Sequence, residues 1–324
     1  MPKVGFLGVG WIGRHRMEAI LATDAVEAAA IADPSPECVG EALKLAPHAQ
    51  VVSGLDEMLA LNLDGVVIAT PSALHAAQSV QALAAGAAVF CQKPLGRAAD
   101  EVRGVVDAAR AADRLLGVDL SYRFTDGMTR IVPLLREGAL GHVRAVDLTF
   151  HNAYGPDKPW FYDPAQSGGG CVMDLGVHLV DLALWALGWP KVETVEAHLL
   201  AGDAPARPDQ CEDYAVATLK LAGGTLVRLA CSWRLQAGRE AVIAAEIYGS
   251  DGGAALRNVD GSFYDLQAEQ FSGTSSERLC GPGDDWGGRA AADWARRLAA
   301  GERFDPQAER LVAVARVLDA IYAR

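Results

Sequence analysis

The sequence predicts an α/β domain built on a doubly wound parallel sheet, followed by an α+β domain with a largely antiparallel sheet. Up to about residue 120, short apolar segments alternate with helical ones, as in parallel strands joined by crossover helices. After about residue 190, alternating segments follow one another with short Gly-rich turns between them, which is typical of antiparallel strands. We therefore expect a first domain over 1–120 and a second over 121–324.

The expected elements of the first domain follow in a regular order. Strands are expected over 3–7, 26–32, near 51, and over 65–69, 87–91 and 115–118, with helices over 14–21, 36–45, 55–61, 72–85 and 98–111. The segment Gly65–Ala69 is apolar throughout, as a parallel strand buried on both faces should be. Ser72 follows it and is a candidate cap for the next helix.

The second domain has a different pattern. Helices are expected over 126–137, 174–187, 285–300 and 306–322, and strands over 143–150, 192–200, 213–221, 225–233 and 241–248, with weaker ones over 253–256 and 262–266. Within 225–233 the side chains of Val227, Leu229, Cys231 and Trp233 share one face, and those of Leu226, Arg228, Ala230 and Ser232 share the other. With helices on one face only, the other face of such a sheet needs cover, which predicts self-association.

A glycine-rich turn follows the first strand. The residues Gly8, Gly10, Trp11, Ile12 and Gly13 belong to a G-x-G-x-x-G motif between a strand and a helix. The first glycine permits the tight turn, the second lets the backbone approach a pyrophosphate, and the third lets the helix pack closely on the strand. In this context the motif predicts dinucleotide binding and a Rossmann domain.

An acidic residue ends the second strand. Asp33 lies 20 residues after Gly13, where a carboxylate hydrogen-bonds the ribose hydroxyls of the adenosine. The following residues 34–37 provide no cation for a 2′-phosphate, so we expect NAD, with NADP less favoured. Arg14 and Arg16 could reach such a phosphate, but we interpret them as surface charge on the first helix.

Two other strand ends face the same edge of the expected sheet. Thr70 and Pro71 follow the fourth strand, and Gln92, Lys93 and Pro94 follow the fifth. Ligands in doubly wound sheets bind at the carboxyl ends of the strands. A lysine at this edge can donate a hydrogen bond to a substrate oxygen, although a solvated lysine before a proline is the simpler interpretation of the dipeptide alone.

A second glycine run, Gly168-Gly169-Gly170, opens a helix that carries Asp174 and His178. Positions i and i+4 lie on one helical face, so we expect these two side chains to point the same way. Histidine is the side chain best suited to proton transfer near neutral pH. An Asp/His pair on a helix can also be purely structural.

The composition limits which kinds of binding partner we expect. The formal charge is −12, from 41 acidic and 29 basic residues, and no basic tract predicts nucleic-acid binding. We expect no membrane span and no leader, because apolar stretches are interrupted and the first strand begins at Lys3. The six cysteines lack paired metal-ligand spacing, so we expect reduced thiols, no metal and a cytoplasmic protein.

Together these motifs resemble the glucose–fructose oxidoreductase/inositol dehydrogenase (Gfo/Idh/MocA) family. The resemblance rests on the glycine turn, on Ala69-Thr70-Pro71 with His75, on Lys93-Pro94, and on the run from Gly168 to Asp181. It implies hydride transfer between NAD or NADP and a sugar, polyol or related carbinol. It also implies that Lys93, Asp174 and His178 form the catalytic site, that His75 lies beside the cofactor, that the Lys93–Pro94 bond is cis, and that the protein is a dimer or tetramer.

One residue departs from the family pattern. The glutamate that usually precedes Lys-Pro is Gln92 here, and an amide cannot form an ion pair with the lysine. Other substrate contacts are less defined: Tyr122 and Arg123 follow the sixth strand, and Tyr162 lies in the loop before the glycine run.

Two alternative functions fit the same fold. One is a sensor that binds a dinucleotide without turnover, which the joint presence of Lys93, Asp174 and His178 disfavours, and the other is a transhydrogenase that keeps its cofactor bound.

Overall fold

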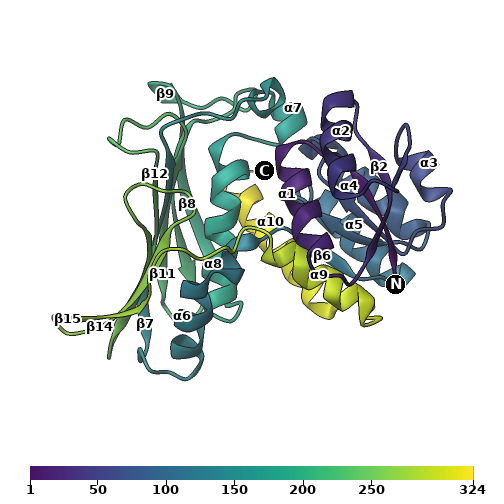
Figure 1. Cartoon of the computed structure of the whole chain (residues 1–324). Helices are drawn as coiled ribbons and strands as arrows, with labels where there is room; N and C mark the ends of the chain where they lie inside the picture. The colour runs from purple at the N-terminus through teal and green to yellow at the C-terminus, as the bar shows by residue number, and fades with distance from the viewer. Residues whose placement is uncertain (324) are drawn as a thin grey trace. The chain divides into compact units, whose positions relative to one another are not determined.

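The computed structural model describes residues 1–323, which form two compact units (Figure 1). The first unit comprises Met1–Asp119 and Gly288–Ala313, and the second comprises Leu120–Gly287 and the described residues from Val314 onwards. The expected boundary near residue 120 lies where the chain passes from one unit to the other. Residues 288–313, which we expected in the second domain, instead pack in the first unit.

The packing of Trp294 explains why this segment joins the first unit. Trp294 lies in α9 (Arg289–Ala299), is 2% exposed, and stacks at a tilt on Phe90 with ring centroids 5.9 Å apart. A Cβ atom on Gly65 or Gly117 would lie within 3 Å of the Trp294 ring, so both strands need glycine where the indole packs. The alanine-rich face of α9 gives no sequence signal for which domain it covers.

The first unit is a six-stranded parallel sheet with helices around it, as predicted (Figure 1). The strand order is β3 (Gln50–Val51), β2 (Glu27–Ala32), β1 (Lys3–Leu7), β4 (Gly65–Ile68), β5 (Ala88–Cys91) and β6 (Leu116–Val118). The helices are α1 (Trp11–Leu21), α2 (Pro36–Leu45), α3 (Leu55–Leu59), α4 (Ser72–Ala84), α5 (Ala99–Ala112) and α9. The order reverses between β1 and β4, which is where doubly wound sheets bind ligands.

The second unit is a nine-stranded, mostly antiparallel sheet with helices on one face (Figure 1). The strand order is β15 (Ser275–Cys280), β14 (Leu266–Ser272), β13 (Gly253–Asn258), β12 (Ala241–Gly249), β7 (Val143–Asn152), β11 (Leu226–Ser232), β10 (Tyr214–Leu221), β8 (Val192–Ala201) and β9 (Ala204–Pro205). The helical elements are η1 (Ser121–Phe124), α6 (Asp126–Arg136), η2 (Pro159–Tyr162), α7 (Pro164–Ser167), a π-helical turn η3 (Val172–Gly176) and α8 (Val177–Ala186). A last helix, α10 (Glu309–Ile321), follows the short turn η4 (Pro306–Ala308) and runs from the first unit into the second.

Two local predictions were wrong. Residues 262–265 form a turn rather than a strand, because Asn258 and Ser262 make side-chain hydrogen bonds across it, and β14 begins only at Leu266. Ser72 is the first residue of α4 and not its cap, since Pro71 holds that position without a side-chain hydrogen bond.

The core of the second unit explains its most apolar helical stretch. By length and composition the run Pro164–Ala186 could cross a membrane, contrary to our reading of the sequence, but 89% of its apolar window is buried inside the protein.

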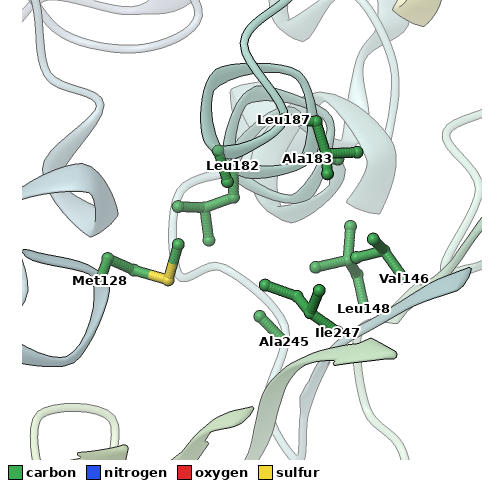
Figure 2. A pocket seen from close by; sticks show the side chains of 9 residues that line it. Met128, Val146, Leu148, Leu182, Ala183, Leu187, Ala245 and Ile247 are labelled. Atoms are coloured by element: carbon green, nitrogen blue, oxygen red, sulfur yellow. The ribbon is translucent and has the colours of Figure 1, made fainter. Parts of the chain in front are cut away.

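Figure 2 shows side chains of α6, α8 and the sheet around a cavity of about 10 Å³. This space is entirely apolar and at the lower limit for one water molecule, so it is a packing gap rather than a ligand site.

The two faces of this sheet differ as predicted. Val227, Leu229 and Cys231 of β11 are at most 2% exposed beneath the helices, whereas Leu226 on the other face is 46% exposed. No described helix of this unit covers that second face (Figure 1).

Candidate active site

The glycine turn of the first unit has the geometry of a phosphate cradle. Gly8 has φ +83°, and a Cβ there would lie 2.5 Å from the Ala69 carbonyl oxygen. A Cβ on Gly13 would lie 2.1 Å from the carbonyl oxygen of Gly8, so helix and turn pack as the motif predicts. Gly10 differs, because nothing lies within 4 Å of its Cβ position. The backbone is therefore open where a pyrophosphate would approach.

The N-terminus of α1 fits an anion as well. Gly10 is the N-cap of this helix and offers no side chain to the first backbone N–H groups, and the first turn holds no acidic residue. Trp11 in that turn is 63% exposed and stacks on His15, with ring centroids 6.2 Å apart. Free N–H groups at a helix N-terminus bind phosphate well.

Asp33 is fixed against this turn. Its carboxylate accepts hydrogen bonds from the backbone N–H of Val9, at 2.8 Å, and from that of Ser35, at 2.9 Å. A carboxylate has further acceptor capacity after two such bonds. The side chain is thus held beside the glycine turn and retains lone pairs for ribose hydroxyls.

His75 joins two strand ends at the same edge. The buried ring has Nε2 2.7 Å from the carbonyl oxygen of Thr70 and Nδ1 2.7 Å from that of Pro94. Burial lowers the pKa of His75, and Lys93 acts in the same direction, while the two carbonyls oppose them. Each ring nitrogen lies at hydrogen-bond distance from a carbonyl oxygen, and the nitrogen that carries the proton donates to its carbonyl, so His75 connects the loops after β4 and β5. The bond between Lys93 and Pro94 in the second of these loops is cis, as predicted.

In the second unit, Asp174 is held by a residue that the sequence did not single out. Its Oδ2 accepts a hydrogen bond of 3.0 Å from Nε1 of Trp233, which follows β11. Asp174 lies in the π-helical turn η3, whereas His178 lies in α8. The expectation that the two side chains share one helical face assumes a regular α-helix, and this segment is not regular. π-helical turns occur frequently at functional sites.

His178 lies in an aromatic environment. It is 8% exposed, and its ring centroid is 5.0 Å from that of Tyr122 and 6.4 Å from that of Phe150. Tyr122 therefore lies beside His178. Burial raises the pKa of Tyr122 far above its ordinary value, so this phenol is poorly suited to exchange a proton near neutral pH.

The second glycine run packs against protein atoms. Glu212, 1% exposed, accepts hydrogen bonds from the N–H groups of Gly170, at 2.9 Å, and Val172, at 2.8 Å. Its Oε1 also accepts one of 2.7 Å from the hydroxyl of Tyr322. A Cβ on Gly169 would lie 2.1 Å from that hydroxyl, and one on Gly170 would lie 1.8 Å from the Glu212 carbonyl oxygen. The run thus lets Glu212 and Tyr322 anchor the start of the helix that carries Asp174 and His178.

The two remaining substrate candidates have protein partners. Arg123 forms a two-pronged ion pair with buried Asp181 and lies over the rings of Trp185 and Trp189. Tyr162, 38% exposed, packs edge-on against Trp233 with ring centroids 5.5 Å apart. The ring of Tyr162 thus contacts Trp233, which holds Asp174. The guanidinium of Arg123 instead forms its ion pair with α8.

Comparison with known proteins agrees with this geometry. Residues 2–120 match the model of an oxidoreductase family with an NAD-binding Rossmann fold, and residues 128–255 match the GFO/IDH/MocA C-terminal domain. A putative UDP-kanosamine synthase oxidoreductase subunit of Amycolatopsis mediterranei is 31% identical over 278 residues, covering 79% of this chain and 75% of the relative. The chain belongs to the Gfo/Idh/MocA family. It is an NAD(P)-dependent oxidoreductase.

Other Gfo/Idh/MocA proteins are similar over different lengths. The D-glucoside 3-dehydrogenase of Escherichia coli is 26% identical over 211 residues, which cover 61% of this chain and only 60% of that protein. The crystal structure of GenD2 from gentamicin A biosynthesis, in complex with NAD, is 26% identical with a TM-score of 0.84, covering 99% of this chain and 93% of its own. Levoglucosan dehydrogenase in complex with NADH has the same TM-score at 22% identity, over 99% and 96% of the two chains.

Three residues of this site were missed from the sequence. Glu212 and Trp233 come from strand ends about 40 and 60 residues after the glycine run, and Tyr322 comes from the end of the chain. The only available signal was the glycine run itself, because consecutive glycines imply that something approaches the backbone closely. Among residues 1–323, no group of three or more His, Cys, Asp or Glu side chains could hold a metal ion.

Proposed function

We propose that the protein transfers hydride between NAD and a secondary alcohol or ketone of a sugar, polyol or related carbinol. The observation that carries this proposal is the anchored helix start with Asp174 and His178, in a chain whose first unit has an open glycine cradle. The substrate class rests on the relatives, which include dehydrogenases of glucosides and of inositol.

Each of the three residues has a role in this proposal. NAD, when bound, supplies the hydride acceptor. His178 removes the proton of the substrate hydroxyl as general base, and Lys93 donates a hydrogen bond to the same oxygen, which stabilises developing alkoxide. Asp174, fixed by the indole N–H of Trp233, orients the substrate or His178.

We further propose that NAD binds more tightly than NADP. Asp33, held beside the glycine turn, would repel a 2′-phosphate. A structural neighbour, the 3-ketoreductase KijD10, was crystallised with NADP, so the family does not decide this point. Arg16 is not the surface charge that we expected, because it is 7% exposed and paired with Asp119. Calorimetric titration with both cofactors tests the preference, and equal or tighter NADP binding would show that Arg14 recruits the phosphate.

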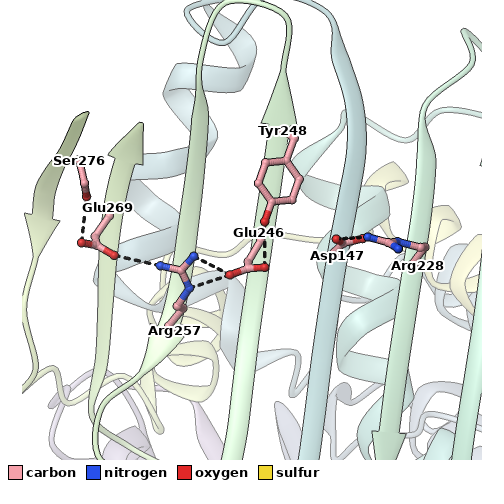
Figure 3. A network of polar contacts seen from close by, with 7 residues as sticks. All are labelled: Asp147, Arg228, Glu246, Tyr248, Arg257, Glu269 and Ser276. Atoms are coloured by element: carbon pink, nitrogen blue, oxygen red, sulfur yellow. Dashed lines mark hydrogen bonds and ion pairs between the residues drawn. The ribbon is translucent and has the colours of Figure 1, made fainter. Parts of the chain in front are cut away.

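The uncovered face of the nine-stranded sheet supports a homo-oligomer. Figure 3 shows its ion pairs: Arg228 pairs with Asp147, and Arg257 bridges Glu246 and Glu269. This row of ion-paired charges, with exposed Leu226 nearby, suits a second copy of the same face. Light scattering should give a multiple of 34.1 kDa at micromolar concentration, and a monomer would contradict the proposal.

The substrate experiment is a panel of sugars and polyols with NAD, followed through NADH absorbance. At least one secondary alcohol should be turned over, and Lys93→Ala and His178→Ala should abolish that turnover. Tight NAD binding without turnover of any panel member would favour the sensor interpretation.

A further inference from the structure

A buried polar cluster lies directly beneath the loop that carries Lys93. Oδ2 of Asp119 accepts two hydrogen bonds, one of 2.6 Å from Nε of Arg16 and one of 2.7 Å from Nε2 of Gln92. The three residues are 1%, 7% and 7% exposed, in that order. Buried charges of this kind persist only when they are paired and hydrogen-bonded.

The cluster joins three parts of the first unit. Arg16 lies in α1, the helix that begins directly after Gly10 of the cofactor turn. Asp119 follows β6, and its backbone N–H donates to the carbonyl oxygen of Cys91, the last residue of β5. Gln92 follows Cys91 and precedes Lys93. The helix of the cofactor turn is thus linked by two side-chain hydrogen bonds to the neighbour of the lysine.

The chemistry of the cluster requires an uncharged donor at position 92. Arg16 and Asp119 carry one positive and one negative charge, which balance. The amide of Gln92 adds a donor and no charge. A glutamate at the same place would set a second carboxylate against Oδ2 of Asp119, in a region almost without solvent, where like charges repel strongly.

We propose that Gln92, Asp119 and Arg16 are positioning residues for Lys93, with Gln92 and Asp119 matched to one another as amide and carboxylate. This assignment rests on the proposed function, because the position of Lys93 matters only if Lys93 acts on the substrate. The departure from the family glutamate is then compensated within the chain: the carboxylate beside the lysine loop is that of Asp119.

The test is a reciprocal exchange, measured with the best alcohol of the panel. Gln92→Glu and Asp119→Asn should each lower kcat/KM by about tenfold or more, because small displacements of a catalytic group have large effects on rate. The loss should appear in kcat, with the Kd for NAD within about threefold of wild type, since Lys93 acts on the substrate. The double variant Gln92→Glu/Asp119→Asn keeps one carboxylate and one amide, and should recover most of the loss.

Gln81 provides a matched control. Its amide also donates to an aspartate, Asp56, in the same unit, but this pair is exposed, so Gln81→Glu should leave kcat/KM unchanged. If Gln92→Glu keeps wild-type kcat while Lys93→Ala is inactive, the positioning role is wrong. If Lys93→Ala is also fully active, the failure lies in the proposed function. Should Gln92→Glu not fold, the double variant decides: a folded, active protein supports the pairing, and an inactive one contradicts it.

Discussion

The two glycine motifs of this protein contain glycines that are needed for opposite physical reasons. In the first unit, Gly10 is surrounded by open space, and its lack of a side chain leaves room for something that is not protein. In the second unit, Gly169 and Gly170 have no such room, because the Tyr322 hydroxyl and the Glu212 backbone already fill it. Gly10 thus leaves room for a ligand, whereas Gly169 and Gly170 leave room for the protein's own chain.

This difference distinguishes glycines that make room for a ligand from glycines that let the protein pack against itself. A glycine required by a ligand can be replaced at little cost to the fold, whereas a glycine required by protein contacts cannot. The helix that carries Asp174 and His178 is therefore held by buried contacts within the second unit, and the glycine turn of the first unit is left open at Gly10. Substitutions that add a single methyl group can test the distinction directly.

Gly170→Ala should have the largest effect. Its Cβ would meet backbone atoms of Glu212, which cannot move aside as a flexible side chain would. We expect the free energy of unfolding to fall by about 1–3 kcal/mol or more, together with turnover, because the anchor of the Asp174–His178 segment shifts. Thermal and denaturant unfolding measure the change.

The matched control is Gly104→Ala in α5. No atom lies within 4 Å of that Cβ position, and alanine is the better helix former by about 1 kcal/mol. This variant should be as stable as wild type or more so. Equal stability of the Gly170 and Gly104 variants would remove the basis of the comparison.

Gly10→Ala should show the opposite behaviour. No protein atom opposes the new methyl group, so stability should change by no more than about 1 kcal/mol, the cost of alanine at an N-cap. NAD affinity should fall by about tenfold or more, since the methyl group occupies space for the pyrophosphate. Calorimetry measures both Kd values, and unchanged NAD affinity would mean that the dinucleotide does not approach Gly10.

Tyr322→Phe should have the smallest effect of the series. It removes the hydroxyl that donates to Glu212, but the same carboxylate oxygen keeps its hydrogen bond from the N–H of Val172, so the unfolding free energy should fall by only about 0.5–1 kcal/mol. Tyr154 is a control for stability, because its hydroxyl makes a long contact of 3.5 Å with Glu240 at an exposed site. If Tyr154→Phe and Tyr322→Phe are equally stable, Tyr322 does not anchor the glycine run.

Local pattern was enough to predict much of this fold. The parallel sheet, the glycine turn and the position of Asp33 follow from residues close together in the sequence. The alternation in β11 likewise predicted which side chains share a face, and on one of these faces Val227 and Cys231 are fully buried.

The rest depends on contacts between distant residues. Trp294 packs on strands more than 170 residues earlier in the chain, so α9 could not be assigned to the first unit from its own pattern. The bond from Trp233 to Asp174 and that from Tyr322 to Glu212 are likewise invisible to periodicity. The π-helical turn also has no period that marks it in the sequence.

The central claim is that His178 and Lys93 act together on one substrate oxygen, and a double-mutant cycle tests it most directly. His178→Ala and Lys93→Ala should each lower kcat/KM by about 10²-fold or more, with nearly unchanged Kd for NAD. The double variant should be little worse than either single one, because residues that work as a unit are not additive. Wild-type rates in His178→Ala, or losses that multiply in the double variant, would contradict the account.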